Sequence, residues 1–308
     1  MHLVSYLIPL YNKEEYIVEA IESVLKEASE ELDVEICLVD DGSSDSSLTV
    51  VSSLFGEHPK VKIHAFSKNK GKNAAFNSAF EMAAGDFVCL LGADDFLVPG
   101  RTKRLLDETL ATEKSVYGGL FRYDNDAKAT IEKVLPAPPS YLKNLLGSSL
   151  SGGCAMLWKK DAQSVFPLPE NIKFEDWWIS FFLLKNNRVA VLTEPVLYYR
   201  LHAGNDCGTV VPTQDSVAKD YARHYDFFSA IKPYIKGFWP NLYFRKSVAL
   251  RDAFFGRGKL KYFLYFPIDV TWMKTVSFMI FGTSFVYQAK SRIDQLRNSA
   301  RLRLKSSL

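Results

Sequence analysis

The 308-residue sequence has few cysteines and no spacing that would pair them around a metal ion. The four are Cys37, Cys89, Cys154 and Cys207, and none forms a CxxC pair. Cys37 and Cys89 lie in apolar, strand-like runs, where a free thiol behaves as a small hydrophobic side chain. This usage excludes the common zinc sites and indicates a reducing compartment.

Three further absences narrow the class of protein. No GxGxxG follows the first apolar run and GxxxxGK(S/T) occurs nowhere, which disfavours a dinucleotide dehydrogenase or a P-loop enzyme. The net charge of +3 is too small to indicate nucleic acid as a partner. The opening residues MHLVSYLIPLY lack the basic segment and longer apolar stretch of a signal peptide, so we expect a cytoplasmic location.

Residues 1–100 alternate strand-like and helix-like segments, in a chain that is 47% hydrophobic. The predicted strands are Leu3–Pro9, Val34–Asp40, Val61–Phe66 and Asp86–Leu91. The predicted helices are Glu15–Ala28, a helix capped by Asp45 or Ser44 that runs through about Phe55, and Lys72–Ala84. This alternation predicts an α/β fold with parallel strands and right-handed crossovers. In such open sheets ligands bind at the carboxyl ends of the strands, where the polar clusters of this half lie.

The rest of the chain changes character twice. Residues 101–211 mix strands with short helices, and prolines at 136, 138 and 139 interrupt the pattern. From residue 212 onward the pattern becomes helical and strongly aromatic. We therefore predict three segments, 1–100, 101–211 and 212–308.

The first two predicted strands end in residues suited to a nucleotide. Tyr11 could stack on a base and Lys13 could approach a phosphate, although an ordinary strand-to-helix loop explains them equally well. Asp40 and Asp41 can accept hydrogen bonds from a uracil N–H or a ribose hydroxyl. A capped turn explains the following Gly42–Asp45 run, and explains the doubled aspartate less well.

The third predicted strand leads into the basic run Asn69-Lys70-Gly71-Lys72-Asn73, just before an alanine-rich helix. Gly71 permits a tight turn. Lys70 and Lys72 lie near the start of that helix, where the helix dipole also favours anions. The run fits a diphosphate neighbour, and a solvated basic loop would be equally ordinary.

The fourth predicted strand ends in Gly92-Ala93-Asp94-Asp95 and gives the strongest local signal. Two adjacent carboxylates at the mouth of a hydrophobic strand cost free energy unless they are paired or bind a cation. Mg²⁺ or Mn²⁺ takes oxygen ligands and bridges a diphosphate. The alternative is a helix N-cap ahead of Pro99.

The series IPLYN, VDDGSSD, NKGKNAAFN and LLGADD resembles the GT-A-fold family 2 glycosyltransferases, strongly over residues 3–110 and more loosely over about 150–205. The resemblance implies a Rossmann-like, mostly parallel sheet flanked by helices, with residues 1–100 as the nucleotide-sugar half, 101–211 as the acceptor half and 212–308 as a helical extension. It implies a nucleotide pocket lined by Pro9, Tyr11, Asp41 and Lys72, and a ribose and metal site at Asp94 and Asp95. Gly92 departs from the family, which often has aspartate there, and this puts metal affinity in doubt.

The sequence Glu175-Asp176-Trp177-Trp178 opens a helical run and looks like the family's Glu-Asp cluster, in which the aspartate is the general base. An inverting transfer needs a group that takes the proton of the acceptor hydroxyl. We predict Asp176 for this role, with Glu175 orienting it. Two acids in a first helical turn also suit the helix dipole, which is the alternative explanation. Trp177 and Trp178 could offer a sugar-stacking platform, although at least one should be a core residue.

Two more regions carry candidate residues. Ser151-Gly152-Gly153-Cys154 allows close backbone approach beneath the sugar or acceptor, or forms a simple turn. Arg200 and His202, ahead of the polar loop 203–208, resemble the family's Arg-x-His element. The resemblance implies that Arg200 contacts the diphosphate and that His202 is an additional metal ligand.

The C-terminal segment indicates a membrane surface. The apolar residues 260–287 are interrupted by Pro267, Asp269 and Lys274, and so fall short of the roughly 18–20 residues that a spanning helix needs. Residues 290–308 carry six basic residues against Asp294 alone. We predict peripheral contact of 260–308 with the inner face of an anionic membrane; the alternative is helical packing with a solvated tail.

These patterns together predict an inverting glycosyltransferase that uses Mn²⁺ or Mg²⁺. It would move a hexosyl or N-acetylhexosaminyl group from a nucleotide-sugar donor, with UDP favoured, to a glycan or lipid-linked acceptor, as in cell-surface polysaccharide synthesis. A sugar nucleotidyltransferase would want a glycine-rich loop after the first strand, and Leu10–Glu15 has no glycine. A non-catalytic carbohydrate- or partner-binding module that kept the fold stays open because of Gly92.

Overall fold

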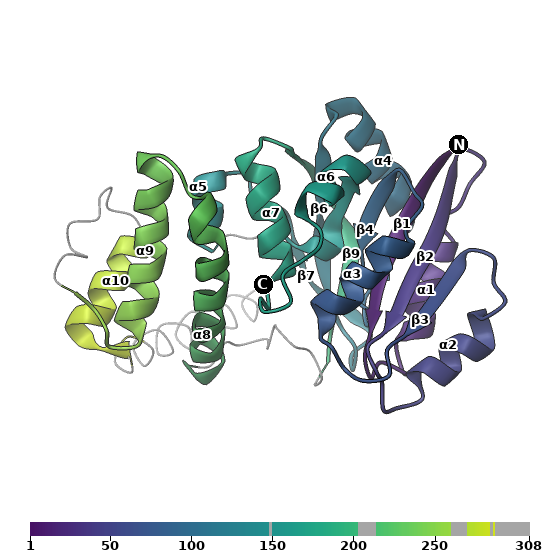
Figure 1. The fold of residues 1–308 in the computed structure, drawn as a ribbon, viewed down its shortest axis with the longest axis horizontal. Helices are drawn as coiled ribbons and strands as arrows, with labels where there is room; N and C mark the ends of the chain where they lie inside the picture. The colour runs from purple at the N-terminus through teal and green to yellow at the C-terminus, as the bar shows by residue number, and fades with distance from the viewer. Residues whose placement is uncertain (148–149, 203–213, 260–269, 284–285, 287–308) are drawn as a thin grey trace, which may run out of the picture. The chain divides into compact units, whose positions relative to one another are not determined.

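The computed structural model describes residues 1–147, 150–202, 214–259, 270–283 and 286 (Figure 1). The chain divides into two compact units, Met1–Asn144 with Ser148–Thr209, and Leu145–Gly147 with Val210–Leu308. The predicted boundary between residues 211 and 212 and the predicted polar loop 203–208 lie outside the described residues, and both stay predictions.

The described part of the first unit is built on a nine-stranded sheet in the order β3-β2-β1-β4-β8-β6-β9-β5, with β7 paired to β6. The strands are β1 His2–Leu10, β2 Leu32–Asp40, β3 Val61–Ala65, β4 Phe87–Leu90, β5 Phe96–Leu97, β6 Ser115–Asp124, β7 Ala129–Val134, β8 Ala155–Trp158 and β9 Val189–Leu201. The pairs β3-β2, β2-β1, β1-β4 and β6-β9 are parallel, whereas β8, β7 and β5 pair antiparallel. The mostly parallel α/β sheet predicted from the sequence is confirmed.

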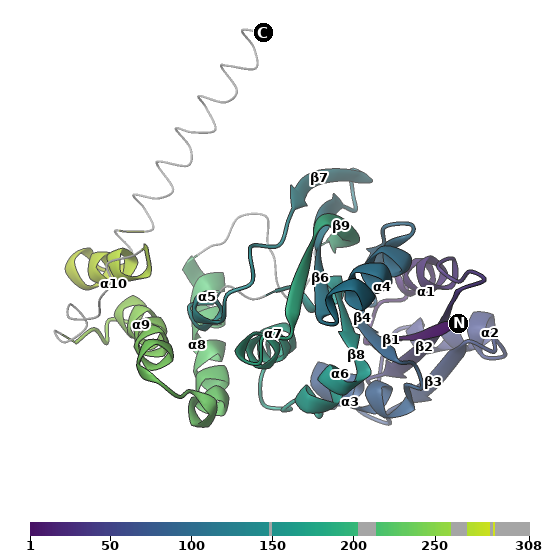
Figure 2. The ribbon, with the colours of Figure 1, turned by 90° about the horizontal axis from the view of Figure 1, so that it is seen from above.

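Helices cover both faces of this sheet. They are α1 Ile17–Leu25, α2 Ser47–Phe55, α3 Lys72–Met82, α4 Arg101–Thr112, α5 Tyr141–Leu145, α6 Lys159–Val165 and α7 Glu175–Lys185. Figure 2 shows α1 and α4 on one face and α3 and α6 on the other. The helix α1 buries Ile17, Ala20, Ile21 and Val24, the apolar positions whose spacing predicts it.

The start of α2 differs from the prediction in a small way. The N-cap is Ser46, and its side chain makes no capping hydrogen bond. Asp45 instead accepts a hydrogen bond at Oδ1 from the Ser47 backbone N–H, at 2.9 Å. The predicted capping residue Asp45 therefore lies one position before the N-cap, and its side chain closes a turn there.

The second unit is helical in its described part, as the sequence predicts for the C-terminal extension. It contains α8 Gln214–Ile231, α9 Phe238–Phe254 and α10 Val270–Phe281. Helices α9 and α10 pack together through Leu250, Ala253, Phe254 and Phe278 (Figure 1). No helix among the described residues is long and apolar enough to cross a membrane.

A buried carboxylate fixes the turn that leads into β4. Glu35 on β2 is 7% exposed and accepts hydrogen bonds from Ser5 Oγ at 2.6 Å and from the backbone N–H groups of Ala84 and Gly85. Lys62 Nζ lies 2.7 Å from its other oxygen. Burial alone would raise the pKa of Glu35, but the bonds from Lys62 and Ser5 outweigh it and lower the pKa. The network holds β4, and hence the acids that follow it, against β1.

Replacing Glu35 by alanine should destabilise the sheet unit by about 3 kcal/mol, because buried donors lose their acceptor. Urea unfolding followed by circular dichroism measures this, with the exposed Glu57→Ala as a matched control expected within about 0.5 kcal/mol of wild type. Since the folded pKa is lowered, the Glu35 contribution should be present at neutral pH and be lost as the pH falls below about 4.3. Equal effects of the two variants would contradict the assigned role.

Candidate active site

The carboxyl ends of β1, β2 and β4 meet at one edge of the sheet. Leu10 pairs with Asp40 across β1 and β2, and the Asp41 N–H donates to the Leu10 carbonyl at 2.8 Å. On the other side of β1, the Leu91 N–H donates to the Leu7 carbonyl at 3.0 Å. The polar clusters that follow these strands are therefore neighbours, which is the arrangement the strand pattern predicts.

The two aspartates after β2 accept hydrogen bonds from two different segments of backbone. Asp40 accepts hydrogen bonds at Oδ2 from the backbone N–H groups of Gly42 and Ser43, at 3.1 and 3.0 Å. Asp41 accepts from the Lys70 and Gly71 N–H groups at 2.6 and 2.9 Å. Turn chemistry thus accounts for Asp40, whereas Asp41 joins the end of β2 to the loop before α3.

That loop and the end of β1 both lie next to the end of β2, where Asp41 stands. Gly71 has φ +97°, a backbone conformation that favours glycine. Tyr11 leaves the end of β1 with 44% of its surface exposed, and Pro9 is partly buried in the strand beneath it. An exposed ring beside two buried carboxylates is a suitable surface for a planar base.

Asp94 and Asp95 lie beyond β4 and take different partners. The Asp94 carboxylate lies at Oδ2 2.9 Å from Lys13 Nζ and 3.0 Å from His202 Nε2. Asp95 accepts the Arg200 backbone N–H at Oδ1, at 2.9 Å. The structure therefore gathers the end of β1, the end of β4 and the end of β9 around one acidic pair, including all three predicted metal ligands.

The pKa values of Asp94 and Asp95 shift in opposite directions. Burial and the adjacent Asp94 charge raise the pKa of Asp95 well above its usual range. Burial would also raise the pKa of Asp94, but the hydrogen bonds and charges of Lys13 and His202 outweigh it and lower the pKa. A cation at this place would offset the repulsion between the two carboxyl groups.

Gly92 lies directly against the two carboxylates. A Cβ atom on it would lie 3.0 Å from Asp94 Oδ1 and 3.1 Å from Asp95 Oδ2, tighter than ordinary contact. No three His, Cys, Asp or Glu side chains in the described residues form a ready metal cluster. The donor types of Asp94, Asp95 and His202 nevertheless fit Mn²⁺ or Mg²⁺, whose remaining ligands would come from a diphosphate and water.

Arg200 braces this pair through protein contacts. Its Nε donates to the Asp94 carbonyl at 2.8 Å and its Nη1 to Asn125 Oδ1 at 2.9 Å, while Nη2 pairs with Glu19. The guanidinium carbon lies 4.8 Å from the centroid of the Phe96 ring. Arg200 thus lies beside the acidic pair and holds the Asp94 backbone, and its contact with the diphosphate stays a prediction.

Glu175 and Asp176 begin α7 and connect to the basic loop of the other half of the sheet. Lys72 Nζ lies 2.8 Å from Glu175 Oε1. Asp176 accepts the Trp177 N–H at Oδ1, at 2.7 Å. Burial and the neighbouring Glu175 raise the pKa of Asp176 to about 7, while the Lys72 charge acts in the opposite direction. Asp176 can therefore accept a proton near neutral pH, better than an ordinary aspartate.

The glycines before β8 allow the close approach that the sequence suggests. A Cβ on Gly152 would lie 3.3 Å from the Asp176 Cβ.

The predicted tryptophan platform is wrong, because Trp177 and Trp178 are 3% and 8% exposed. Their indole N–H groups donate to the carbonyls of Asn144 and Val165, so both rings belong to the core.

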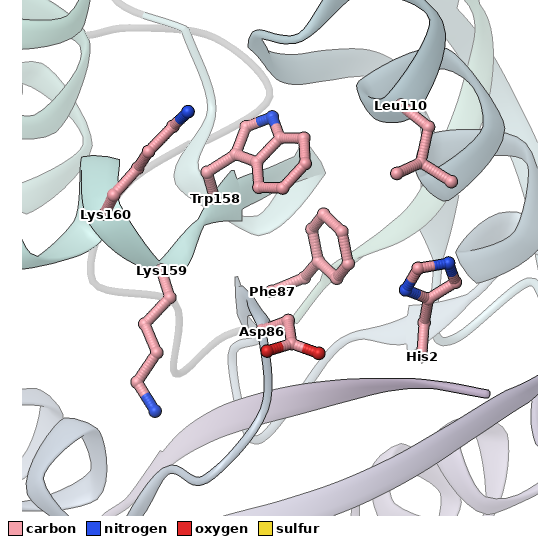
Figure 3. A pocket seen from close by; sticks show the side chains of 7 residues that line it. All are labelled: His2, Asp86, Phe87, Leu110, Trp158, Lys159 and Lys160. Atoms are coloured by element: carbon pink, nitrogen blue, oxygen red, sulfur yellow. The ribbon is translucent and has the colours of Figure 1, made fainter.

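A cavity of about 330 Å³ lies elsewhere, at the amino end of β4 (Figure 3). The Phe87 and Trp158 rings line it, with centroids 4.8 Å apart. Asp86 is the single carboxylate among its lining residues. This cavity therefore offers no acidic pair and lies at the wrong end of the strands for the chemistry above.

Several partners of the site could not be picked out in the sequence. Glu19 and Asn125 bind Arg200 across 181 and 75 residues of chain. Tyr16 packs on the His202 ring with centroids 4.6 Å apart. No local motif marks these residues, and the helical spacing of α1 explains Glu19 only as a solvent-facing position.

The acidity of Asp176 gives a direct test by carboxyl NMR titration of aspartate-labelled protein. One signal, absent in Asp176→Asn, should titrate near pH 7. Glu175→Gln should lower that pKa, because a like charge is removed, and Lys72→Met should raise it, because a cation is removed. A signal unmoved by either variant, or moved in the same direction by both, would count against the arrangement.

Comparison with known proteins finds similar structures and similar sequences. The structure is similar to Staphylococcus aureus TarS residues 1–349, solved in complex with UDP-GlcNAc, with TM-score 0.59, 17% identity and coverage of 92% of this chain and 82% of that one. The sequence is 30% identical over 239 residues to an uncharacterised glycosyltransferase from Nostoc sp., covering 71% of each chain. It is 40% identical over 106 residues to chondroitin synthase from Escherichia coli, covering 34% of this chain and 15% of that one.

The model of the family described as glycosyl transferase family 2 matches residues 5–166, which is more than half of the chain. This range contains most of β1, all of β2 to β4, the acidic pair and the basic loop before α3. The chain therefore belongs to glycosyl transferase family 2, and it is a glycosyltransferase with a GT-A-like fold.

Proposed function

We propose that this glycosyltransferase moves a sugar, with inversion, from a nucleotide-diphosphate donor to a hydroxyl of a glycan or lipid-linked acceptor in polysaccharide synthesis. One observation carries the proposal, the 2.8 Å pair between Lys72 and Glu175. It joins the basic loop of the donor half to the residue next to Asp176. A diphosphate bound at Lys72 would therefore lie beside the base that serves the acceptor.

A UDP-sugar is the favoured donor. Tyr11 would supply a stacking face, and the Asp41 carboxylate, Pro9 and the Gly71 turn would line a small base pocket. Asp94 would hold the ribose, and Lys72 would meet the diphosphate. TarS, which shares the fold, was solved with UDP-GlcNAc, and this supports the choice of UDP.

Mn²⁺ or Mg²⁺ would be held by Asp95, Asp94 and His202. When bound, the ion would neutralise charge that develops on the departing diphosphate. The protein's own cations contribute in the same place. Lys13, 2.9 Å from Asp94, brings positive charge to the edge where the diphosphate would bind.

Asp176 acts on the acceptor. Its carboxylate takes the proton of the attacking hydroxyl as the new bond to the anomeric carbon forms and the bond to the diphosphate breaks. Glu175, held by Lys72, keeps negative charge beside it and so raises its affinity for a proton. Gly152 packs closely against Asp176, where a side chain would press on the base.

Asp176→Asn should reduce sugar transfer by roughly 10²–10⁴-fold, the usual contribution of a general base, because the amide cannot accept the proton. Metal-dependent UDP binding, measured by calorimetry, should stay within about 2-fold of wild type, because Asp176 lies on the acceptor side. The exposed Asp107→Asn serves as the matched control and should keep full activity. Equal losses of transfer and of UDP binding would overturn the role of Asp176.

We propose that the C-terminal unit contacts an anionic membrane from the cytoplasmic side. Large apolar side chains are exposed on its described helices: Phe238 and Trp239 on α9, and Val270, Met273, Ile280 and Phe281 on α10. The basic residues of 290–308, which lie outside the described residues, would add electrostatic attraction. Lipid-linked acceptors would be reached at such a surface.

Cosedimentation with vesicles tests this contact. The protein should bind phosphatidylcholine vesicles that contain phosphatidylglycerol and bind pure phosphatidylcholine vesicles weakly. The double variant Ile280→Glu/Phe281→Glu should weaken binding roughly 10-fold, because charge replaces exposed apolar area. Leu54→Glu, a 59%-exposed position of the first unit, should have no effect. Binding that is absent, or insensitive to the double variant, would contradict the proposal.

A further inference from the structure

A second cavity, of about 570 Å³, lies within the first unit where α1, β5, β7 and β9 come together. Its volume falls within the roughly 300–1,000 Å³ that small-molecule sites occupy. It is lined by Glu19, Ser23, Lys26, Glu27, Phe96, Leu97, Pro99, Gly100, Tyr123, Lys128, Thr130 and Tyr198. None of these residues belongs to the donor pocket, the acidic pair or the base.

Aromatic rings form one wall of this cavity. Phe96 and Tyr198 stack with centroids 4.6 Å apart, and Tyr123 meets Phe96 edge-on at 5.1 Å. All three side chains are only partly buried. Among the described residues, neither tyrosine hydroxyl makes a hydrogen bond, so both phenols are open to a ligand. Rings and phenols that stay accessible in a hollow suit a ligand with both an apolar face and hydroxyl groups.

The acidic and basic side chains at the rim of the cavity are equal in number. Two carboxylates, Glu19 and Glu27, stand against two ammonium groups, Lys26 and Lys128. Glu27 is fixed, because it accepts the N–H groups of Gly100 and Thr102 at 2.7 and 2.6 Å. A rim without net charge disfavours nucleotides and other strongly anionic ligands.

We propose that this cavity binds a neutral saccharide. The apolar face of a pyranose ring would lie on Phe96 and Tyr198, and its hydroxyls would bond to the two phenols and to the rim carboxylates. The inference rests on the proposed function, since such a ligand would be a distal part of the acceptor or product glycan. A purely apolar partner fits less well, because Leu97 and Pro99 are the aliphatic members of the lining.

Arg200 contacts both the wall of this cavity and the acidic pair. The Arg200 guanidinium lies 4.8 Å from the Phe96 centroid and 5.6 Å from that of Tyr123, and it pairs with Glu19. The same guanidinium donates to the Asp94 carbonyl. A saccharide on these rings would therefore rest against the residue that positions the acidic pair.

A filling variant tests the site without removing a contact that holds the fold. Thr130→Trp on β7 places a large side chain in the cavity. Ile131→Trp is the matched control, because Ile131 is an exposed neighbour that is not among the residues lining the cavity. Cellotetraose, maltotetraose and chitotetraose are the probes, measured by saturation-transfer NMR and by calorimetry on the whole chain. Both variants should unfold as the wild type does.

At least one tetrasaccharide should bind the wild type, with affinity lowered 10-fold or more by Thr130→Trp and unchanged by Ile131→Trp. Binding should also be unchanged in Asp176→Asn, because the cavity is separate from the base. Failure of all three probes to bind, or equal weakening by both tryptophan variants, would overturn the proposal. Because binding rather than transfer is measured, that failure leaves the proposed function standing, and loss of transfer leaves this site standing.

Discussion

Two adjacent carboxylates at the end of β4 need partners, and the rest of the site supplies them. Asp94 and Asp95 are largely removed from water and repel each other, which would destabilise the fold if nothing opposed it. Lys13 and His202 hold Asp94, and the Arg200 backbone N–H holds Asp95. These partners arrive from the ends of β1 and β9, so the acidic pair ties both halves of the sheet to one edge.

An ion pair also connects two elements beside Asp176. Lys72 starts α3 and Glu175 starts α7, and their ion pair connects two helices that leave the same sheet. Since Lys72 lowers the pKa of Asp176 and Glu175 raises it, the proton affinity of the base depends on which partner Lys72 has. A diphosphate that draws Lys72 away would strengthen the base in the complex that needs it.

The sequence predicts the donor half well because its signals are local. Each strand from β1 to β4 is a short apolar run that ends in polar residues, and Gly71 marks a backbone conformation that glycine favours. Parallel pairing then brings Asp41 and Asp94 to one edge without further information. The role proposed for Asp176 comes from the family resemblance, since two acids in a first helical turn are common on other grounds.

The rest of the site depends on contacts that no local pattern contains. His202 meets Asp94 across 108 residues, and the bracing of Arg200 by Glu19 spans 181. Burial likewise decides whether an aromatic side chain lies in the core or at the surface, which the sequence leaves open. Trp177 and Trp178 could be a surface platform by sequence, but their N–H groups find acceptors inside the core. The raised pKa of Asp176 is also a tertiary effect, because it arises from burial first and from Glu175 second.

We propose that the acidic pair, without a carboxylate at Gly92, binds a divalent ion together with a nucleotide. Mn²⁺ binding followed by electron paramagnetic resonance, with and without UDP, measures this coupling. We expect UDP to tighten Mn²⁺ binding by at least about 10-fold in the wild type, and Asp95→Asn to abolish this gain. Mn²⁺ affinity that ignores UDP, or that survives Asp95→Asn unchanged, would contradict it.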